Sequence, residues 1–156
     1  MAGRSALINV MFKAADAASR RIMRDFGEVE NLQVSRKGAG DFVTRADTNA
    51  EQTIQEELAK SRPEWGFIME EGGIIEGDAD APKWVIDPID GTTNFTHGIP
   101  HFAISIAVMK EGKITAGLIF DPARNECFFA EAGKGAFLNE RRIRVSGRRN
   151  FDDAIF

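Results

Sequence analysis

The stretch that most constrains the fold of this chain is residues 84–95, near its middle. Its first three residues, 84–86, are apolar, which is typical of the end of an interior strand. Pro88 lacks a backbone N–H and has a fixed φ, so we expect the strand to end there. Gly91 permits a close backbone approach, and the Thr-Thr-Asn after it can begin a helix. The stretch therefore predicts a buried strand, a turn and a helix N-terminus in direct succession.

Asp87 and Asp90 place two carboxylates in that turn. Carboxylates bind hard divalent cations, whereas the free N–H groups at a helix N-terminus bind phosphate oxygens. A site that offers both suits a metal-assisted reaction of a phosphate. Plain turns also use Asp-Pro and Asp-Gly pairs. A calcium loop of the EF-hand type is excluded, because it needs oxygen side chains at alternate positions and Pro88 and Ile89 occupy the intervening ones.

The whole string resembles the Asp-Pro-x-Asp-Gly-Thr-x-Asn-Phe signature of the inositol monophosphatase family. This family consists of magnesium-dependent, lithium-sensitive phosphatases related to fructose-1,6-bisphosphatase. The resemblance implies a first magnesium ion on Glu70, Asp87 and the backbone carbonyl of Ile89. It implies a second ion on Asp87 and Asp90, with one further aspartate from an element that this sequence does not contain. A third ion is expected on Glu70 and water.

The resemblance also assigns roles in the reaction. The Val-Thr-x-x-Asp pattern at residues 43–47 looks like the family's, in which this aspartate helps to activate the attacking water. Asp47 and Thr92 are therefore expected to orient and deprotonate the water, with Glu70 as the third catalytic residue. The amides of Gly91 and Thr92 are expected to hold the phosphate. Two further residues are expected to contact the metal ligands rather than the metal: Glu71 and Thr93.

Two helices are predicted in the first 60 residues. From residue 5 to about 25, apolar residues recur at three- and four-residue spacing, and Ser5 is a suitable N-cap. The polar segment 27–42 contains three glycines and is predicted to be a loop or an irregular hairpin. A second helix then runs to about Lys60. Asp47 falls in or near its first turn, so the sequence alone favours a helix-capping role for it, beside the catalytic role that the resemblance implies.

Short strands dominate the remainder of the chain. The apolar segment 66–69 is predicted to lie next to 84–86, which would bring Glu70 beside Asp87. Residues 74–83 are predicted to be a connecting loop. Apolar runs from residue 102 onward, separated by turn signals, predict an antiparallel meander. Segregated helices and strands indicate an α+β fold, and the resemblance implies the N-terminal half of a layered αβαβα sandwich.

His97 and His101 have the spacing of one helix face, but Gly98 and Pro100 interrupt that face. We therefore interpret both histidines as non-ligands. Coordination by oxygen atoms alone also agrees better with magnesium than imidazole would.

The net charge and the cysteine content of the chain limit the partners and the compartment that we expect for it. A net charge of −4 argues against general attraction to nucleic acid or to an anionic membrane. The arginines of residues 141–149 are interpreted as a solvated hairpin edge, with a binding patch as the alternative. The single cysteine, Cys127, cannot form an internal disulfide and suits a reducing compartment. Because no segment resembles a signal peptide or a membrane span, a cytoplasmic location is expected.

The resemblance extends over nearly all of residues 1–156, yet the family's Trp-Asp-x-Ala-Ala-Gly element is absent from the sequence. We therefore expect these residues to be the N-terminal half of a phosphatase domain, without its C-terminal half. The expected substrate is a small phosphorylated metabolite, first of all myo-inositol monophosphate, with histidinol, sugar and nucleotide phosphates as alternatives. A binding partner of the transcription machinery and an inactive metal-binding half-domain are the alternative functions. A homodimer is expected.

Overall fold

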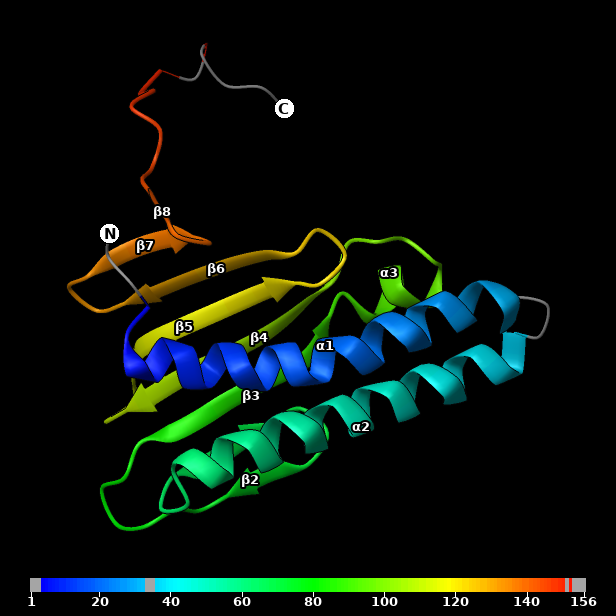
Figure 1. Cartoon of the computed structure of the whole chain (residues 1–156), viewed down its shortest axis with the longest axis horizontal. Helices are drawn as coiled ribbons and strands as arrows, with labels where there is room; N and C mark the ends of the chain where they lie inside the picture. Colours follow the sequence, from blue (N-terminus) through cyan, green and yellow to red (C-terminus); the bar gives the residue numbers. More distant parts are fainter. Residues whose placement is uncertain (1–3, 33–35, 151, 153–156) are drawn as a thin grey trace.

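Within residues 4–32, 36–150 and 152, which the computed structural model describes, two long helices lie side by side on one face of an eight-stranded sheet (Figure 1). The long helices are α1 (Ala6–Leu32) and α2 (Arg36–Ser61), and a short helix α3 (Thr92–Thr96) follows the acidic turn. The segment after the last strand projects away from the sheet (Figure 1). This arrangement confirms the predicted α+β class.

The sheet is antiparallel except at one pair of strands. Its order is β2-β1-β3-β4-β5-β6-β7-β8, and only β1 and β3 run parallel. From β4 to β8 each strand pairs with the next one in the chain, which confirms the predicted meander. The strands are β1 (Gly66–Met69), β2 (Gly73–Ile75), β3 (Lys83–Asp90), β4 (Ala103–Lys110), β5 (Lys113–Asp121), β6 (Glu126–Glu131), β7 (Gly135–Leu138) and β8 (Arg141–Ile143).

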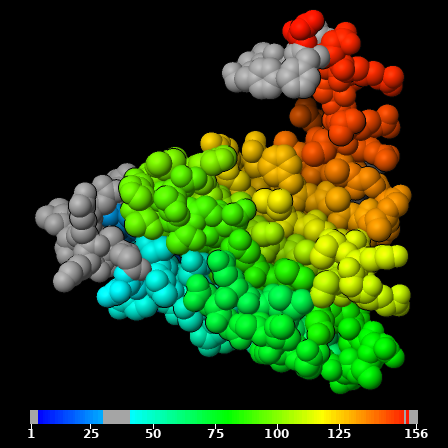
Figure 2. All heavy atoms as spheres, turned by 180° about the vertical axis from the view of Figure 1, so that it is seen from behind, coloured from blue at the N-terminus to red at the C-terminus, as the bar shows by residue number. Residues whose placement is uncertain are grey.

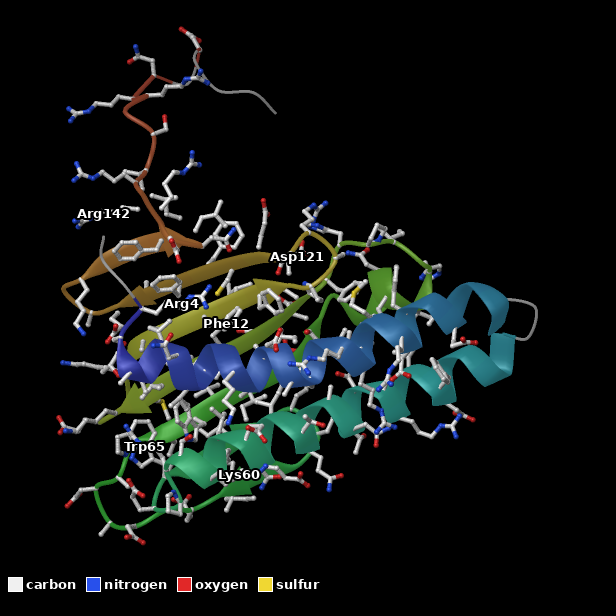
Figure 3. The ribbon with its side chains drawn as sticks, viewed as in Figure 1. Arg4, Phe12, Lys60, Trp65, Asp121 and Arg142 are labelled. Carbon is white, nitrogen blue, oxygen red and sulfur yellow. The ribbon has the colours of Figure 1, made fainter. Side chains whose placement is uncertain are left out.

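The core lies between the helices and the facing side of the sheet. Alternate residues of each strand point to this side, so Trp84, Ile106 and Leu118 are almost completely buried. The helices contribute a matching apolar stripe: Ile8, Met11, Ala15, Ile22, Ile54 and Leu58. At the start of α1, the guanidinium carbon of Arg4 lies 3.8 Å from the ring centroid of Phe12, which closes this end of the core (Figure 3).

The loop or hairpin predicted for residues 27–42 is wrong, because α1 and α2 between them extend over most of this segment. The apolar stripe of α1 continues past its predicted end near residue 25. Val29 is fully buried, and the Phe26 ring contacts Phe95 and Phe102 at centroid distances of 5.4 and 5.0 Å. Burial of this stripe outweighs the weak helix propensity of the nearby glycines.

Two predicted boundaries in the sheet also change. β3 does not end at Pro88 but runs on to Asp90, with an irregular register against β4 between Asp87 and Asp90. A residue without an N–H is tolerated where the ladder is interrupted in this way. The predicted loop at 74–83 begins with a strand instead, because its two isoleucines pair with β1 as part of the edge strand β2.

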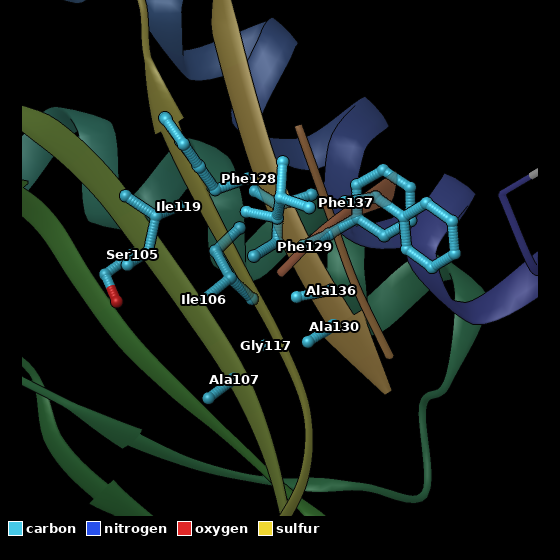
Figure 4. Close-up of a pocket in the computed structure, with 12 residues that line it drawn as sticks. Ser105, Ile106, Ala107, Gly117, Ile119, Phe128, Phe129, Ala130, Ala136 and Phe137 are labelled. Carbon is cyan, nitrogen blue, oxygen red and sulfur yellow. The ribbon is translucent and has the colours of Figure 1, made fainter. Parts of the chain in front are cut away.

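The opposite face of the sheet carries no helix from the described residues (Figures 1 and 2). A hollow of about 350 Å³ lies on β4 to β7 on this side (Figure 4). Its floor is formed by the small and apolar residues that alternate with the core positions: Ser105, Ala107, Gly117, Ile119, Phe128 and Ala130. None of the helices in the described part of the chain is long and apolar enough to span a bilayer.

Candidate metal centre

The ends of two adjacent parallel strands bring Glu70 and Asp87 together. Met69 lies opposite Ile86 in the β1–β3 pair, so Glu70, which follows the end of β1, comes level with Asp87, where β3 continues alongside β4. The predicted adjacency of these strands is therefore confirmed. The charge and hydrogen bonding of the Glu70 side chain both raise the pKa of Asp87. Two carboxyl groups this close cannot both ionise without strong repulsion.

Asp87 is half-buried, and its acidity reflects this position. The pKa of Asp87 is raised to about 7, first by burial and then by the charge and hydrogen bonding of Glu70 and the charge of Asp90. A hydrogen bond from the backbone of Ile89 acts in the opposite direction. Near neutral pH, Asp87 therefore holds a proton for part of the time unless a cation compensates the surrounding charge.

Asp47 approaches the same group of carboxylates from α2. Because α2 begins at Arg36, Asp47 lies in the helix interior, so the predicted capping role is wrong. Its side chain is only 4% exposed. The pKa of Asp47 is raised to about 7, first by burial and then by the charges of four neighbouring carboxylates: Glu70, Glu71, Asp87 and Glu51. Asp47, although it belongs to a helix, therefore interacts electrostatically with the carboxylates near the ends of β1 and β3.

The bulge at the end of β3 carries the next two predicted ligands. Asp90 is exposed, and its charge acts on Asp87. The carbonyl oxygen of Ile89 accepts a hydrogen bond from Oγ1 of Thr92 at 3.1 Å. A carbonyl oxygen has two lone pairs, so this bond leaves one for another partner.

Gly91 connects the acidic turn to α3 in a conformation that suits only glycine. Its φ of 101° is left-handed, and it is the N-cap of α3. A Cβ here would lie 3.0 Å from the carbonyl oxygen of His101 and 3.2 Å from Cα of Phe102. The first N–H groups of a helix have no acceptor within the helix, which is the property that the predicted phosphate site at Gly91 and Thr92 requires.

The described structure does not pair Asp47 with Thr92. The hydroxyl group of Thr92 donates to Ile89 instead, although α2 and α3 are in contact. The proximity of Asp47 and Thr92 around a shared water remains a prediction. Thr93 is exposed, and its expected contact with a metal ligand also remains a prediction.

Two orphaned oxygens test whether these residues fit a metal ion. Among the described residues, Oδ1 of Asp47 and Oδ1 of Asp87 are buried without a hydrogen-bond partner. Such atoms are unfavourable unless a cation or water contacts them. No three acidic, histidine or cysteine side chains of the described residues already form a metal cage. Magnesium commonly uses one or two carboxylates and several waters, so this oxygen-rich group fits magnesium in ligand type and charge.

Glu51 belongs to this group and was missed as a functional residue from the sequence. The sequence places Thr48 and Glu51 at capping-box spacing, but the hydroxyl group of Thr48 donates to the carbonyl oxygen of Thr44 at 2.9 Å. Glu51 is 4% exposed and accepts hydrogen bonds from the N–H groups of Glu71 and Gly72. Its spacing of four residues from Asp47, on one helix face, is the signal that indicates its place in the site.

The two histidines have contacts outside the group of carboxylates. Nδ1 of His97 lies 2.7 Å from the carbonyl oxygen of Thr93, and Nδ1 of His101 lies 3.2 Å from Nη1 of Arg124. The same Arg124 nitrogen pairs with Oδ2 of Asp121 at 2.7 Å; Figure 3 labels Asp121 at the end of β5.

A cavity of about 330 Å³ opens directly beside the acidic turn. It is lined by Asp90, Gly91, Asn94, His101, Phe102, Ala103, Ile119, Asp121 and Phe128. A small molecule in this space would lie against the turn that carries the predicted metal and phosphate ligands.

Fold and site together define an α+β protein with a candidate divalent-cation centre at paired strand ends. The model of the inositol monophosphatase family matches residues 4–156, and the chain belongs to this family. Its fold is that of the N-terminal part of the family's structures. The crystal structure of extragenic suppressor protein SuhB from Bartonella henselae superposes with a TM-score of 0.84 at 49% identity, over 96% of this chain and 58% of that chain.

Curated relatives carry two different names. Inositol-1-monophosphatase of Mesorhizobium japonicum is 55% identical over 152 residues, which is 97% of this chain and 57% of that protein. Nus factor SuhB of Pseudomonas aeruginosa is 45% identical over 96% of this chain and 56% of that protein. The chain therefore spans slightly more than half the length of these relatives.

Proposed function

We propose that the protein containing this chain is a magnesium-dependent phosphomonoesterase that hydrolyses a small phosphorylated metabolite, with myo-inositol monophosphate as its substrate. The observation that carries the proposal is the meeting of Asp47, Glu70 and Asp87, two of which have buried oxygens without a partner. Similarity to inositol-1-monophosphatase of Mesorhizobium japonicum supports the choice of substrate.

The carboxylates would hold the metal. Glu70, Asp87 and the carbonyl of Ile89 would bind one magnesium ion, and Asp87 with Asp90 would contribute to a second. When bound, magnesium lowers the pKa of a water and stabilises negative charge on phosphate oxygens. Bound cations also compensate the mutual repulsion of these side chains, which explains why a protein would keep so many acids together.

Asp47 would act as the base in the reaction. A buried carboxyl with a pKa of about 7 can accept a proton at neutral pH, which is the requirement for general-base catalysis. It would accept the proton of the attacking water, and the hydroxyl group of Thr92 would orient that water. The amides of Gly91 and Thr92 would hold the phosphate oxygens as the bond to the leaving group breaks.

Release of inorganic phosphate from myo-inositol 1-phosphate tests the proposal. The complete gene product that contains this chain is assayed while magnesium is raised from zero in the presence of a chelator. We expect activity only with magnesium, and its loss in Asp87→Asn. Asp80→Asn changes an exposed acid in the loop before β3 and serves as the matched control. Undiminished hydrolysis by Asp87→Asn, or hydrolysis without a divalent cation, would contradict the proposal.

A second candidate function rests on the similarity to Nus factor SuhB of Pseudomonas aeruginosa. In this case the protein would bind a component of the transcription machinery. The exposed arginines around β8 offer a basic contact surface: Arg141, Arg142, Arg144, Arg148 and Arg149. Co-purification with RNA polymerase that is lost when Arg144, Arg148 and Arg149 are replaced by Ser would support it. Co-purification that is unchanged by those replacements would remove this surface from the argument.

A further inference from the structure

We infer that Glu51 is a positioning residue that sets the place of Glu70 by holding the turn directly behind it; the inference rests on the metal-dependent function proposed above. Glu51 lies about one helical turn after Asp47 in α2. Its Oε1 accepts the N–H of Gly72 at 2.7 Å, and its Oε2 accepts the N–H of Glu71 at 3.0 Å. One carboxylate therefore holds two successive amides of the turn between β1 and β2.

Glu71 and Gly72 are exposed residues, yet the N–H groups of both donate to a carboxylate that is only 4% exposed. Burying an ionised carboxylate without a cation is unfavourable, and none of the ion pairs among the described residues includes Glu51. Two charge-assisted bonds at fixed angles instead determine the direction in which the turn leaves the strand.

Gly72 is closely packed between the side chains of Glu51 and Met69. A Cβ built on Gly72 would lie 3.0 Å from Oε1 of Glu51 and 2.8 Å from Cε of Met69. Met69 is the last residue of β1, and Glu70 follows it. The turn is thus held from the strand on one side and from α2 on the other, with Glu70 between the two attachments.

The consequence is a fixed relation between two parts of the proposed site. Asp47, the proposed base, and Glu51 belong to the same helix. Glu70, the proposed metal ligand, belongs to the turn that Glu51 holds. Glu51 therefore joins the helix that carries the base to the strand end that carries the ligand, without itself contacting metal or substrate.

Magnesium binding to the complete gene product tests this inference directly. Titration calorimetry is compared for wild type, Glu51→Gln and the control Glu56→Gln, which changes an exposed glutamate of the same helix. We expect Glu51→Gln to weaken magnesium affinity by roughly 10- to 100-fold, the usual effect of losing a group that orients a metal ligand. Turnover at saturating magnesium should fall less than magnesium affinity, because neither the base nor a ligand is removed. Hydrogen exchange of the Glu71 and Gly72 amides should accelerate.

A second variant separates positioning from charge. Gly72→Ala keeps the Glu51 charge but places a Cβ against Oε1 of Glu51 and Cε of Met69, so these side-chain ends must shift. The variant disturbs the contact between Glu51 and the turn and should weaken magnesium affinity in the same direction. If Glu51→Gln does not fold, Gly72→Ala decides the question. Folded variants with wild-type magnesium affinity would overturn the inference. If Glu51→Gln weakens magnesium binding but the wild-type protein releases no phosphate, the role of Glu51 is supported and the phosphatase function is rejected. If the wild-type protein releases phosphate but Glu51→Gln binds magnesium as tightly as wild type, the phosphatase function is supported and the role of Glu51 is rejected.

Discussion

At the scale of single residues, the protein concentrates acidic side chains where they repel one another. Asp47 comes from a helix and Asp87 from a strand, and burial together with neighbouring carboxylates raises the pKa of each to about 7. Perturbed carboxyls of this kind are more common at functional sites than elsewhere. Their buried oxygens without partners point in the same direction, because most buried polar atoms have a hydrogen-bond partner.

Replacing Asp47 by Asn tests its role as the base. The amide has nearly the same shape but cannot take up a proton, so turnover of the complete gene product should fall by roughly 10²- to 10⁴-fold. Magnesium affinity should change much less, because Asp47 is not among the proposed ligands. Phosphate release and magnesium titration measure the two effects separately. A variant with wild-type turnover would remove Asp47 from the mechanism.

The same residue predicts how stability depends on pH without metal. The pKa of Asp47 rises from 3.8 to about 7 on folding, so between these values the folded state binds more protons than the unfolded state. The free energy of unfolding should therefore fall as pH rises from about 4 to about 8, by up to about 4 kcal/mol for this group. Urea denaturation with a chelator measures the trend. Asp47→Asn should reduce the slope and leave the part that Asp87 contributes, since the pKa of Asp87 is also raised to about 7; a flat wild-type profile would contradict the pKa assignment.

At the scale of elements, the site depends on three ends that meet: the end of β1, the bulge of β3 and the start of α3. The parallel β1–β3 pair aligns two strand ends, and the bulge lets β3 continue past Pro88 to Asp90. Gly91 then reverses the backbone into α3 within a single residue. α2 contributes through its interior, since Asp47 and Glu51 face the strand ends from one side of the helix.

Gly91→Ala tests the connection between β3 and α3. A left-handed φ is unfavourable for alanine, and its Cβ would also approach His101 and Phe102. We expect a loss of about 1–3 kcal/mol in the free energy of unfolding. Gly112→Ala is the matched control, because Gly112 also has a positive φ but faces open space. Urea midpoints should show the larger loss for Gly91; equal losses would mean that the close approach is unimportant.

At the scale of the whole molecule, the two faces of the sheet differ. The helices cover one face, whereas the other presents the hollow on β4 to β7 (Figures 2 and 4). Ile119 is 48% exposed on this side. Exposed contiguous apolar surface of this kind favours association with another surface. The cavity beside the acidic turn also includes Ile119 and Phe128, so whatever covers this face would lie close to the site.

When residues 1–156 are expressed alone, we expect self-association through this face and no measurable phosphate release. Ile119→Glu should reduce association, because it places a charge in the hollow. Ile99→Glu is the matched control, since Ile99 is 49% exposed but lies outside the hollow. Light scattering measures size, and phosphate release with magnesium measures activity. A monodisperse, active wild-type chain would contradict this prediction, whereas an inactive but magnesium-binding chain would match a half-domain.

Local patterns in the sequence determined the family, the α+β class and the meander. Alternating apolar residues and turn signals specify short strands wherever one face is buried, since the period of a strand is fixed. The acidic turn at residues 84–95 also indicated Asp87 and Asp90 as candidate metal ligands, because the whole motif lies within a few consecutive residues. The expected neighbourhood of Glu70 and Asp87 also followed, because adjacent parallel strands end at the same edge.

Only the tertiary structure decided where the helices end and what Asp47 contacts. Segment 27–42 looks like a loop by composition, yet packing of Phe26 and Val29 against the core carries α1 onward. That change moves Asp47 from a first turn to a helix interior, where it meets carboxylates far away in the chain. Glu51 became visible in the same way, through amides twenty and twenty-one residues ahead of it. Helix and strand propensity depends on neighbouring residues in the sequence, whereas burial and the interaction of charges depend on which distant segments the fold brings together.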